Sequence, residues 1–123
     1  MDMLKAARMG DLGAIRAAIK NSENLNARDA RGMTALIWAV DAGQPAVVKL
    51  LIDAKADLNL TDQYGQTALI LAAGRNDCEL LKLLIDARAN LNIKMLGGAS
   101  ALTVALENKK AEAAVLLKKA GAK

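Results

Sequence analysis

The sequence predicts an all-α solenoid of paired antiparallel helices joined by β-turn loops. The first observation behind this prediction is a residue pattern that recurs every 33 positions along the 123-residue chain. The second is that each period contains two apolar stripes at helical spacing. The third is compositional. The chain has one Pro and only 2% aromatic residues, so thin helices of Ala, Leu, Ile and Val are free to stack closely.

The 33-residue period needs no gap anywhere in the chain. Its repeated positions hold glycine, a hydroxyl residue, asparagine and paired leucines, namely Gly32, Gly65 and Gly98; Thr34, Thr67 and Ser100; Asn26, Asn59 and Asn92; and Leu50-Leu51, Leu83-Leu84 and Leu116-Leu117. We therefore expect one domain of four units, at 1–28, 29–61, 62–94 and 95–123, with the terminal two cut short. Polar residues such as Lys118 suit the terminal units to act as caps.

Each element of one period has a local signal in the sequence. Thr34 stands before an apolar run, where its hydroxyl would cap a first short helix. Gly43 would end that helix, because glycine tolerates the left-handed conformation found after a helix end. Pro45 suits the first turn of a second helix, whose apolar stripe covers 47–52. The turn-rich segment 56–65 then leads into the next unit.

These residues resemble the ankyrin repeat, which has 33 residues and the signature T-P-L-H-x-A. The signature stands here as Thr34-Ala-Leu-Ile-Trp-Ala39, Thr67-Ala-Leu-Ile-Leu-Ala72 and Ser100-Ala-Leu-Thr-Val-Ala105. A later motif of the family, G-A-D-x-N, stands as Lys55-Ala-Asp-Leu-Asn59 and Arg88-Ala-Asn-Leu-Asn92. The resemblance covers the whole chain. It implies stacked helix pairs whose turn tips and first helices form a concave, partner-binding face.

The chain departs from the family pattern in ways that affect stability. The signature histidine is absent, so the hydrogen bonds it usually makes between repeats are missing and side-chain packing must contribute instead. Lys55 and Arg88 occupy the family's glycine position after the second helix. We expect both to have positive φ, at a cost on the order of 1 kcal/mol each. Asn76 and Lys109 replace the glycine represented by Gly43, a change that Asn accommodates more easily than Lys.

The composition offers little for catalysis. The chain has no histidine, and its single cysteine, Cys78, aligns with Pro45 at the start of a second helix. A helix start can lower a thiol pKa, but no base accompanies Cys78, and a structural role is favoured. Asp29 and Asp62 recur at the head of the turn in two successive units, as a structural role predicts. We expect no enzyme activity, no cofactor and no metal site.

The formal charge of +4 allows an alternative function, weak binding of nucleic acid or another anionic surface. The basic residues near the end (Lys109, Lys110, Lys118, Lys119 and Lys123) are better explained as a solvated cap, because few aromatic residues are available to stack on bases. The sequence contains no run of about 18 apolar residues, the length that would be needed to span a membrane. We expect a cytoplasmic monomer, or a periplasmic or secreted one if a signal peptide has been removed.

The positions that vary between units at solvent-facing places are candidates for recognition. Both aromatic residues, Trp38 and Tyr64, fall in this set, and such residues are enriched among interface hot spots. The alternative is that Trp38 fills a gap between inner helices while Tyr64 decorates a turn. The predicted partner-binding set is Arg31, Met33, Trp38, Asp41, Gln63, Tyr64, Gln66, Leu71 and Arg75. We expect a module that binds one folded protein, as an adaptor or as an inhibitor of a partner enzyme.

Overall fold

The computed structural model describes residues 2–123; Met1, which begins the first predicted unit, lies outside them. Within these residues the chain forms eight short helices and no strand. None of these helices is long and apolar enough to cross a membrane. The helices are α1 (Met3–Met9), α2 (Leu12–Lys20), α3 (Ala35–Asp41), α4 (Pro45–Asp53), α5 (Ala68–Arg75), α6 (Cys78–Asp86), α7 (Ala101–Glu107) and α8 (Ala111–Lys119).

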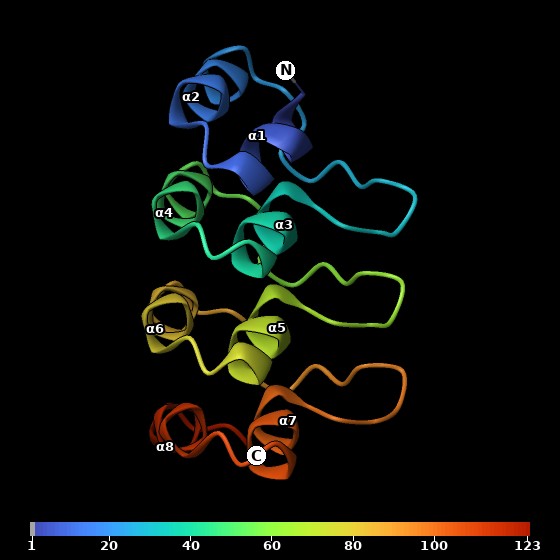
Figure 1. Ribbon diagram of the computed structural model, residues 1–123, viewed down its shortest axis with the longest axis vertical. Coiled ribbons are helices and arrows are strands. Elements are labelled where there is room, and N and C mark those ends of the chain that lie inside the picture. Colours follow the sequence, from blue (N-terminus) through green and yellow to red (C-terminus); the bar gives the residue numbers. More distant parts are fainter. Residues whose placement is uncertain (1) are drawn as a thin grey trace.

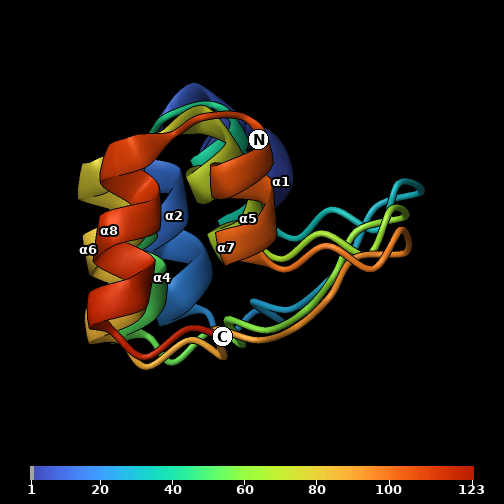
Figure 2. The same cartoon turned by 90° about the horizontal axis from the view of Figure 1, so that it is seen from below.

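The helices stack as pairs in two columns (Figure 1). One column contains α1, α3, α5 and α7, and the other contains α2, α4, α6 and α8; neighbours within each column are in contact. The loops before α3, α5 and α7 all project to the same side, and they overlie one another when the stack is seen end-on (Figure 2). The predicted all-α solenoid is therefore confirmed.

The recurring hydroxyl residues begin the helices of the first column, as predicted. The side-chain oxygens of Thr34, Thr67 and Ser100 each accept a hydrogen bond from the backbone N–H three residues later, at 3.2 to 3.3 Å. All three side chains are buried. A buried hydroxyl that satisfies a free helix N–H stabilises the fold by about 1 kcal/mol. Pro45 occupies the first turn of α4, also as predicted.

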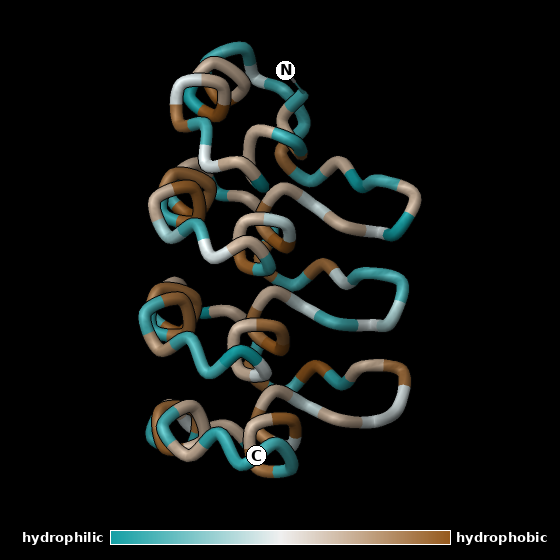
Figure 3. The backbone as a smooth tube through the Cα atoms, in the orientation of Figure 1, coloured by the Kyte–Doolittle hydropathy of each residue, from teal (hydrophilic) through white to brown (hydrophobic). Residues whose placement is uncertain are grey.

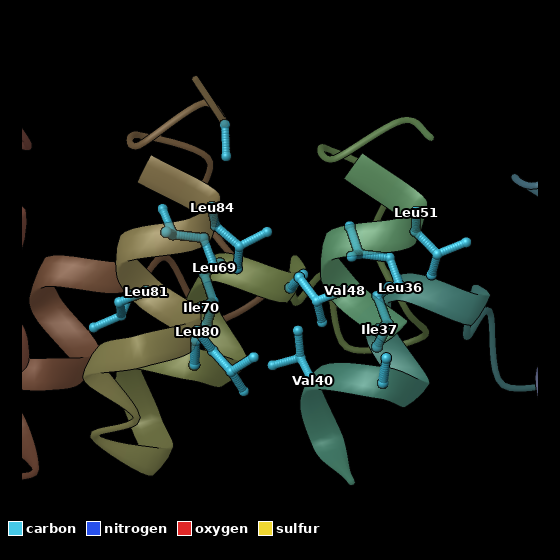
Figure 4. Close-up of a cluster of buried hydrophobic side chains, with 14 of the residues drawn as sticks. Leu36, Ile37, Val40, Val48, Leu51, Leu69, Ile70, Leu80, Leu81 and Leu84 are labelled. Carbon is cyan, nitrogen blue, oxygen red and sulfur yellow. The ribbon is translucent and has the colours of Figure 1, made fainter. Parts of the chain in front are cut away.

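The core lies between the two columns and between successive pairs. Figure 4 shows Leu36 and Ile37 of α3 together with Leu51 of α4, all at most 2% exposed, in the space between the helices. Fully buried alanines, such as Ala39 and Ala72, let the helices approach closely. Many of the most hydrophobic residues lie in the helices, as the colouring of the backbone trace by hydropathy shows (Figure 3). Each pair thus completes its apolar core by contact with its neighbours.

The recurring asparagines join successive units by hydrogen bonds. Asn26 Oδ1 accepts the backbone N–H of Asp57, and Asn59 Oδ1 accepts that of Asn90, both at 2.8 Å. One period later, Asn92 Oδ1 accepts the N–H of Lys123 at 3.1 Å. These bonds supplement the apolar contacts that the missing histidines led us to expect.

The predicted left-handed residues are confirmed. Lys55 and Arg88 have φ values of 68° and 67°, and Asn76 and Lys109 have φ values of 55° and 58°. Ser22, one period before Lys55, also has a positive φ of 57°, which the sequence analysis missed. A side chain with a Cβ is strained in this conformation, whereas glycine is not.

Replacing Lys55 or Arg88 by glycine should therefore stabilise the protein. We expect Lys55→Gly and Arg88→Gly each to raise the free energy of unfolding by about 0.5–1 kcal/mol, because strain is removed from the folded state. Urea unfolding followed by circular dichroism measures the change. The control is Lys49→Gly inside α4, which should destabilise by about 1 kcal/mol because helical φ gives glycine no advantage there. Equal effects at both kinds of position would contradict the strain argument.

Candidate partner-binding surface

The first two of the three projecting loops are tight hairpins, each held by an aspartate at its head. Asp29 Oδ1 accepts the backbone N–H groups of Arg31 and Met33, at 2.9 and 3.0 Å. Asp62 Oδ1 does the same for Tyr64 and Gln66, at 2.9 and 3.0 Å. An aspartate that bonds its own following backbone stabilises a turn locally. The recurrence of these carboxylates thus reflects the structural role that was predicted.

Backbone hydrogen bonds also join the tips of neighbouring hairpins. The N–H of Gln63 donates to the carbonyl of Arg31 at 2.8 Å, and the N–H of Leu96 donates to the carbonyl of Tyr64 at 3.0 Å. The three hairpins therefore form one continuous row beside the first-column helices (Figure 1). A row tied in this way presents its side chains from an ordered backbone.

A groove of about 410 Å³ lies between the first two hairpins and helices α3 and α5. We call it the loop groove. Its lining residues are Arg31, Met33, Trp38, Asp41, Asp62, Gln63, Tyr64, Gln66 and Leu71. Eight of these nine residues were predicted from the sequence, and the structure brings them together. Asp62 was missed, because its recurrence had suggested a purely structural role.

Arg75 is the predicted residue that does not line the loop groove. Its Nη1 donates to the backbone carbonyl of Asp41 at 2.8 Å, and its Nη2 lies near Gly43. The guanidinium thus reaches back from α5 to the C-terminal end of α3, where the helix dipole favours a cation. It ties two neighbouring units together at one end of the groove.

Met33 was predicted to face the solvent, and this prediction is wrong. Its side chain is 8% exposed and belongs to the hydrophobic core, so it contributes only an edge to the groove. The backbone explains this burial. Met33 closes the hairpin through two bonds to Asp29 and directly precedes the buried cap Thr34, so the chain has already entered the core. Gln66, one period later, is half-buried.

Trp38 combines the two interpretations that the sequence left open. Its ring is half-buried against the core, and it also lines the loop groove. Its Nε1 donates to Asp29 Oδ2 at 2.9 Å, while the guanidinium carbon of Arg8 lies 5.0 Å from the ring centroid. Tyr64 is 57% exposed at the hairpin tip. Trp38 is therefore held in place, and Tyr64 is open to solvent.

A second groove, of about 670 Å³, lies on the α1 side of Trp38, and the sequence analysis did not predict it. We call it the N-terminal groove. Its lining residues are Asp2, Met3, Leu4, Lys5, Arg8, Glu23, Asn24, Ala27, Asp29 and Trp38. Trp38 lines both grooves, whereas Arg8 lines only this one. The indole ring therefore forms a wall between them.

The contact with Trp38 changes the acidity of Asp29. Partial burial alone would raise the pKa of this carboxyl group. The hydrogen bonds from the Trp38 indole and the two hairpin amides, together with the charge of Arg31, lower the pKa below its ordinary value. Because the folded-state pKa is lowered, ionised Asp29 stabilises the fold above its unfolded-state pKa. This contribution is lost as the pH falls through the folded-state pKa.

Removing the indole N–H should weaken this effect. We expect Trp38→Phe to raise the pKa of Asp29 and to lower the free energy of unfolding by about 1 kcal/mol at pH 7. Well below the pKa of Asp29, where the carboxyl group is protonated in both folded and unfolded protein, the difference should shrink. Carboxyl NMR titration and urea unfolding at both pH values measure these changes. Adding Asp29→Asn should abolish the pH dependence of the Trp38→Phe effect; its persistence would contradict the assignment.

Cys78 lies on the opposite side of the molecule, between α6 and α8. Its Sγ lies 3.7 Å from Glu112 Oε2, and both residues line a hollow of about 350 Å³. Burial, followed by the charge and the hydrogen bond of Glu112, raises the pKa of the Cys78 thiol. A low thiol pKa at this helix start, the alternative considered from the sequence, is therefore wrong.

Cys78 should consequently react slowly with alkylating agents. The thiolate is the nucleophile, so a raised pKa reduces the reactive fraction at pH 8. We expect Glu112→Gln to increase the rate of iodoacetamide modification, measured by mass spectrometry. The exposed Glu79, also near Cys78 in the sequence, provides a charge-matched control. A Glu79→Gln rate equal to that of Glu112→Gln would contradict the specific contact.

Two comparisons with known proteins bear on this architecture. A family model described as ankyrin repeats (many copies) matches residues 17–72 and, in a second overlapping placement, residues 51–105. The chain is also similar to osteoclast-stimulating factor 1 from Monopterus albus, with 39% identity over 51 residues. This match covers 42% of the chain and 24% of that protein, so it spans about a quarter of the relative's length.

Ankyrin repeats generally mediate interactions between proteins and are typically not enzymes. The matched segments together span most of the chain and include two of its four stacked helix pairs in whole and the other two in part. The signature residues within them are the buried helix caps described above. The chain belongs to the ankyrin-repeat family.

Proposed function

We propose that this protein binds one folded protein partner through the concave face formed by its hairpins and first-column helices. The loop groove is the centre of the proposed interface. The observation that carries this proposal is the gathering of eight variable residues around one hollow. The repeated residues cap helices and turns, whereas these eight differ from unit to unit. With the exception of the buried Met33, their side chains are therefore available for recognition.

The energetics of the groove suit protein binding. Tyr64 offers a large exposed ring with a polar hydroxyl, a combination that is enriched among interface hot spots. Trp38 is already held by Asp29 and Arg8, so its ordering costs little when a partner binds. The hydrogen-bonded hairpin row reduces the cost of ordering the loops in the same way.

The proposed mode of action is occupation of a partner's surface. A monomer with one such face would act as an adaptor, or as an inhibitor if the covered surface is an enzyme's active site. Both actions require the same contact. They differ in whether the free partner has an enzyme activity that the contact blocks. An activity assay on the captured partner separates the two.

We expect tagged wild-type protein to capture its partner from a lysate of the source organism. Tyr64→Ala and Trp38→Ala should each weaken this interaction on the order of tenfold or more, because each removes a large ring from the interface centre. The control is Val115→Ala, which truncates another exposed apolar side chain, on the outer helix α8. Binding of the purified partner is then measured by calorimetry.

The folded state of each variant is checked by circular dichroism and thermal unfolding. Tyr64→Ala is the more decisive variant, because its side chain is more than half exposed and makes little contribution to the core. Undiminished partner binding by a folded variant that lacks both rings would refute the proposed interface.

A further inference from the structure

We infer that the loop groove receives an arginine side chain of the partner, between the carboxylates of Asp41 and Asp62 and beside Leu71. This inference rests on the proposed function and specifies the chemistry that the groove recognises. It comes from comparing equivalent positions, 33 residues apart, along the stack. Three positions matter. They are the head of the hairpin, the fourth residue of the first-column helix that follows it, and a residue in the last turn of the first-column helix of the preceding unit.

At the first step of the stack, the protein supplies its own cation. Arg8 places its guanidinium over the ring of Trp38, 5.0 Å from the centroid. Trp38 in turn donates its indole N–H to Asp29 Oδ2 at 2.9 Å. Both oxygens of this carboxylate therefore accept hydrogen bonds, because Oδ1 is already used by the hairpin amides. At this step the chain itself supplies hydrogen-bond donors for both oxygens of the hairpin aspartate.

One period later, both donors have been replaced. Asp41 stands in the place of Arg8, and Leu71 stands in the place of Trp38. Asp62 keeps the hairpin bonds through Oδ1, but its Oδ2 accepts no hydrogen bond from residues 2–123. The cation and the indole N–H are thus missing, a second carboxylate is present, and all three residues line the loop groove.

At the third step neither carboxylate is present. Gly74, Val104 and Met95 occupy the three equivalent positions, and none carries a charge. The pair of carboxylates is therefore particular to the loop groove, and the periodic hairpin does not require it. A feature that the fold does not need at its other steps is available for recognition.

Two carboxylates and one guanidinium line the loop groove. Among its lining residues, Asp41 and Asp62 are opposed by Arg31, an exposed residue at the hairpin tip. Arg75 is engaged with the carbonyl of Asp41, and Arg8 lies in the N-terminal groove. Arg75 keeps its charge in this bond, so the feature that favours a partner's cation is the unpartnered Oδ2 of Asp62 and the excess of carboxylates over guanidinium groups among the lining residues.

Arginine fits this hollow better than lysine does. Its planar guanidinium can donate two parallel hydrogen bonds to a carboxylate, and it stacks on aromatic faces. The loop groove offers both the free Oδ2 of Asp62 and the aromatic rings of Trp38 and Tyr64. The stacked Arg8 shows the same chemistry on the other side of Trp38.

The test uses an acetylated and amidated Gly-Gly-Arg-Gly-Gly peptide as the probe. We expect saturable changes in the fluorescence of Trp38, the sole tryptophan, and in the backbone NMR signals of Gln66 and Leu71. The lysine peptide should bind more weakly, and the uncharged citrulline peptide should bind least. Equal binding of the arginine and citrulline peptides, or no saturable change up to roughly 10 mM peptide, would overturn the inference.

Two variants locate the site. Asp62→Asn keeps an Oδ1 acceptor for the hairpin but turns the free acceptor into a donor, so arginine binding should weaken by about tenfold or more. Asp86→Asn makes the same change of charge at the exposed end of α6 and should leave binding unchanged. Leu71→Trp should restore the pair made by Trp38 and Asp29, occupy Oδ2 of Asp62 and reduce peptide binding.

These outcomes separate the inference from the proposed function. If the arginine peptide does not bind, but Tyr64→Ala still weakens capture of the partner, the guanidinium site is refuted and the protein interface stands. If partner binding is unaffected by Trp38→Ala and Tyr64→Ala, the interface itself is refuted. If a folded Asp62→Asn variant binds the arginine peptide as tightly as the wild-type protein does, the peptide binds elsewhere and the guanidinium site is refuted.

Discussion

The burial of small apolar side chains between stacked helix pairs is the constraint on which the structure depends. A single pair of seven- to nine-residue helices cannot enclose its own apolar face. Fully buried residues such as Ala39, Ala72 and Leu51 show how closely neighbouring pairs approach. Close approach requires an identical backbone geometry at each step. The caps, the asparagine bonds and the left-handed turns therefore recur with the same period.

This division of labour leaves the hairpins free to carry recognition. Asp29 and Asp62 hold their hairpins through Oδ1, and backbone bonds tie the tips into a row. Apart from Met33 and the half-buried Trp38 and Leu71, the side chains around this row lie outside the core, and they differ from step to step. At the equivalent positions of the next step, Asp41 and Leu71 replace Arg8 and Trp38, so the loop groove has two carboxylates where the preceding step has a stacked guanidinium and an indole hydrogen bond. A uniform scaffold thus supports surfaces that differ chemically.

The sequence predicted most of the proposed site because variation between equivalent positions marks residues that stacking does not require. The prediction of site residues failed where one residue has two roles, and where the direction of the side chain decides whether it reaches the surface. Asp62 is both a turn former and a groove residue, and its recurrence revealed only the first role. Met33 varies between units yet points into the core, because the chain turns inward just before the cap at Thr34. A comparison of residues 33 positions apart does not show whether a variable side chain points into the core or toward the groove.

The sequence by itself determined the repeat length, the helix caps, most of the left-handed positions and the family, because these follow from local backbone chemistry and a strict period. Only the tertiary structure decided how neighbouring units meet. The stacking of Arg8 on Trp38 and the contact of Cys78 with Glu112 join residues 30 and 34 positions apart, and the N-terminal groove brings together residues from Asp2 to Trp38. Such contacts depend on side-chain directions and distances across a stacking interface. Local sequence signals contain no information about those distances.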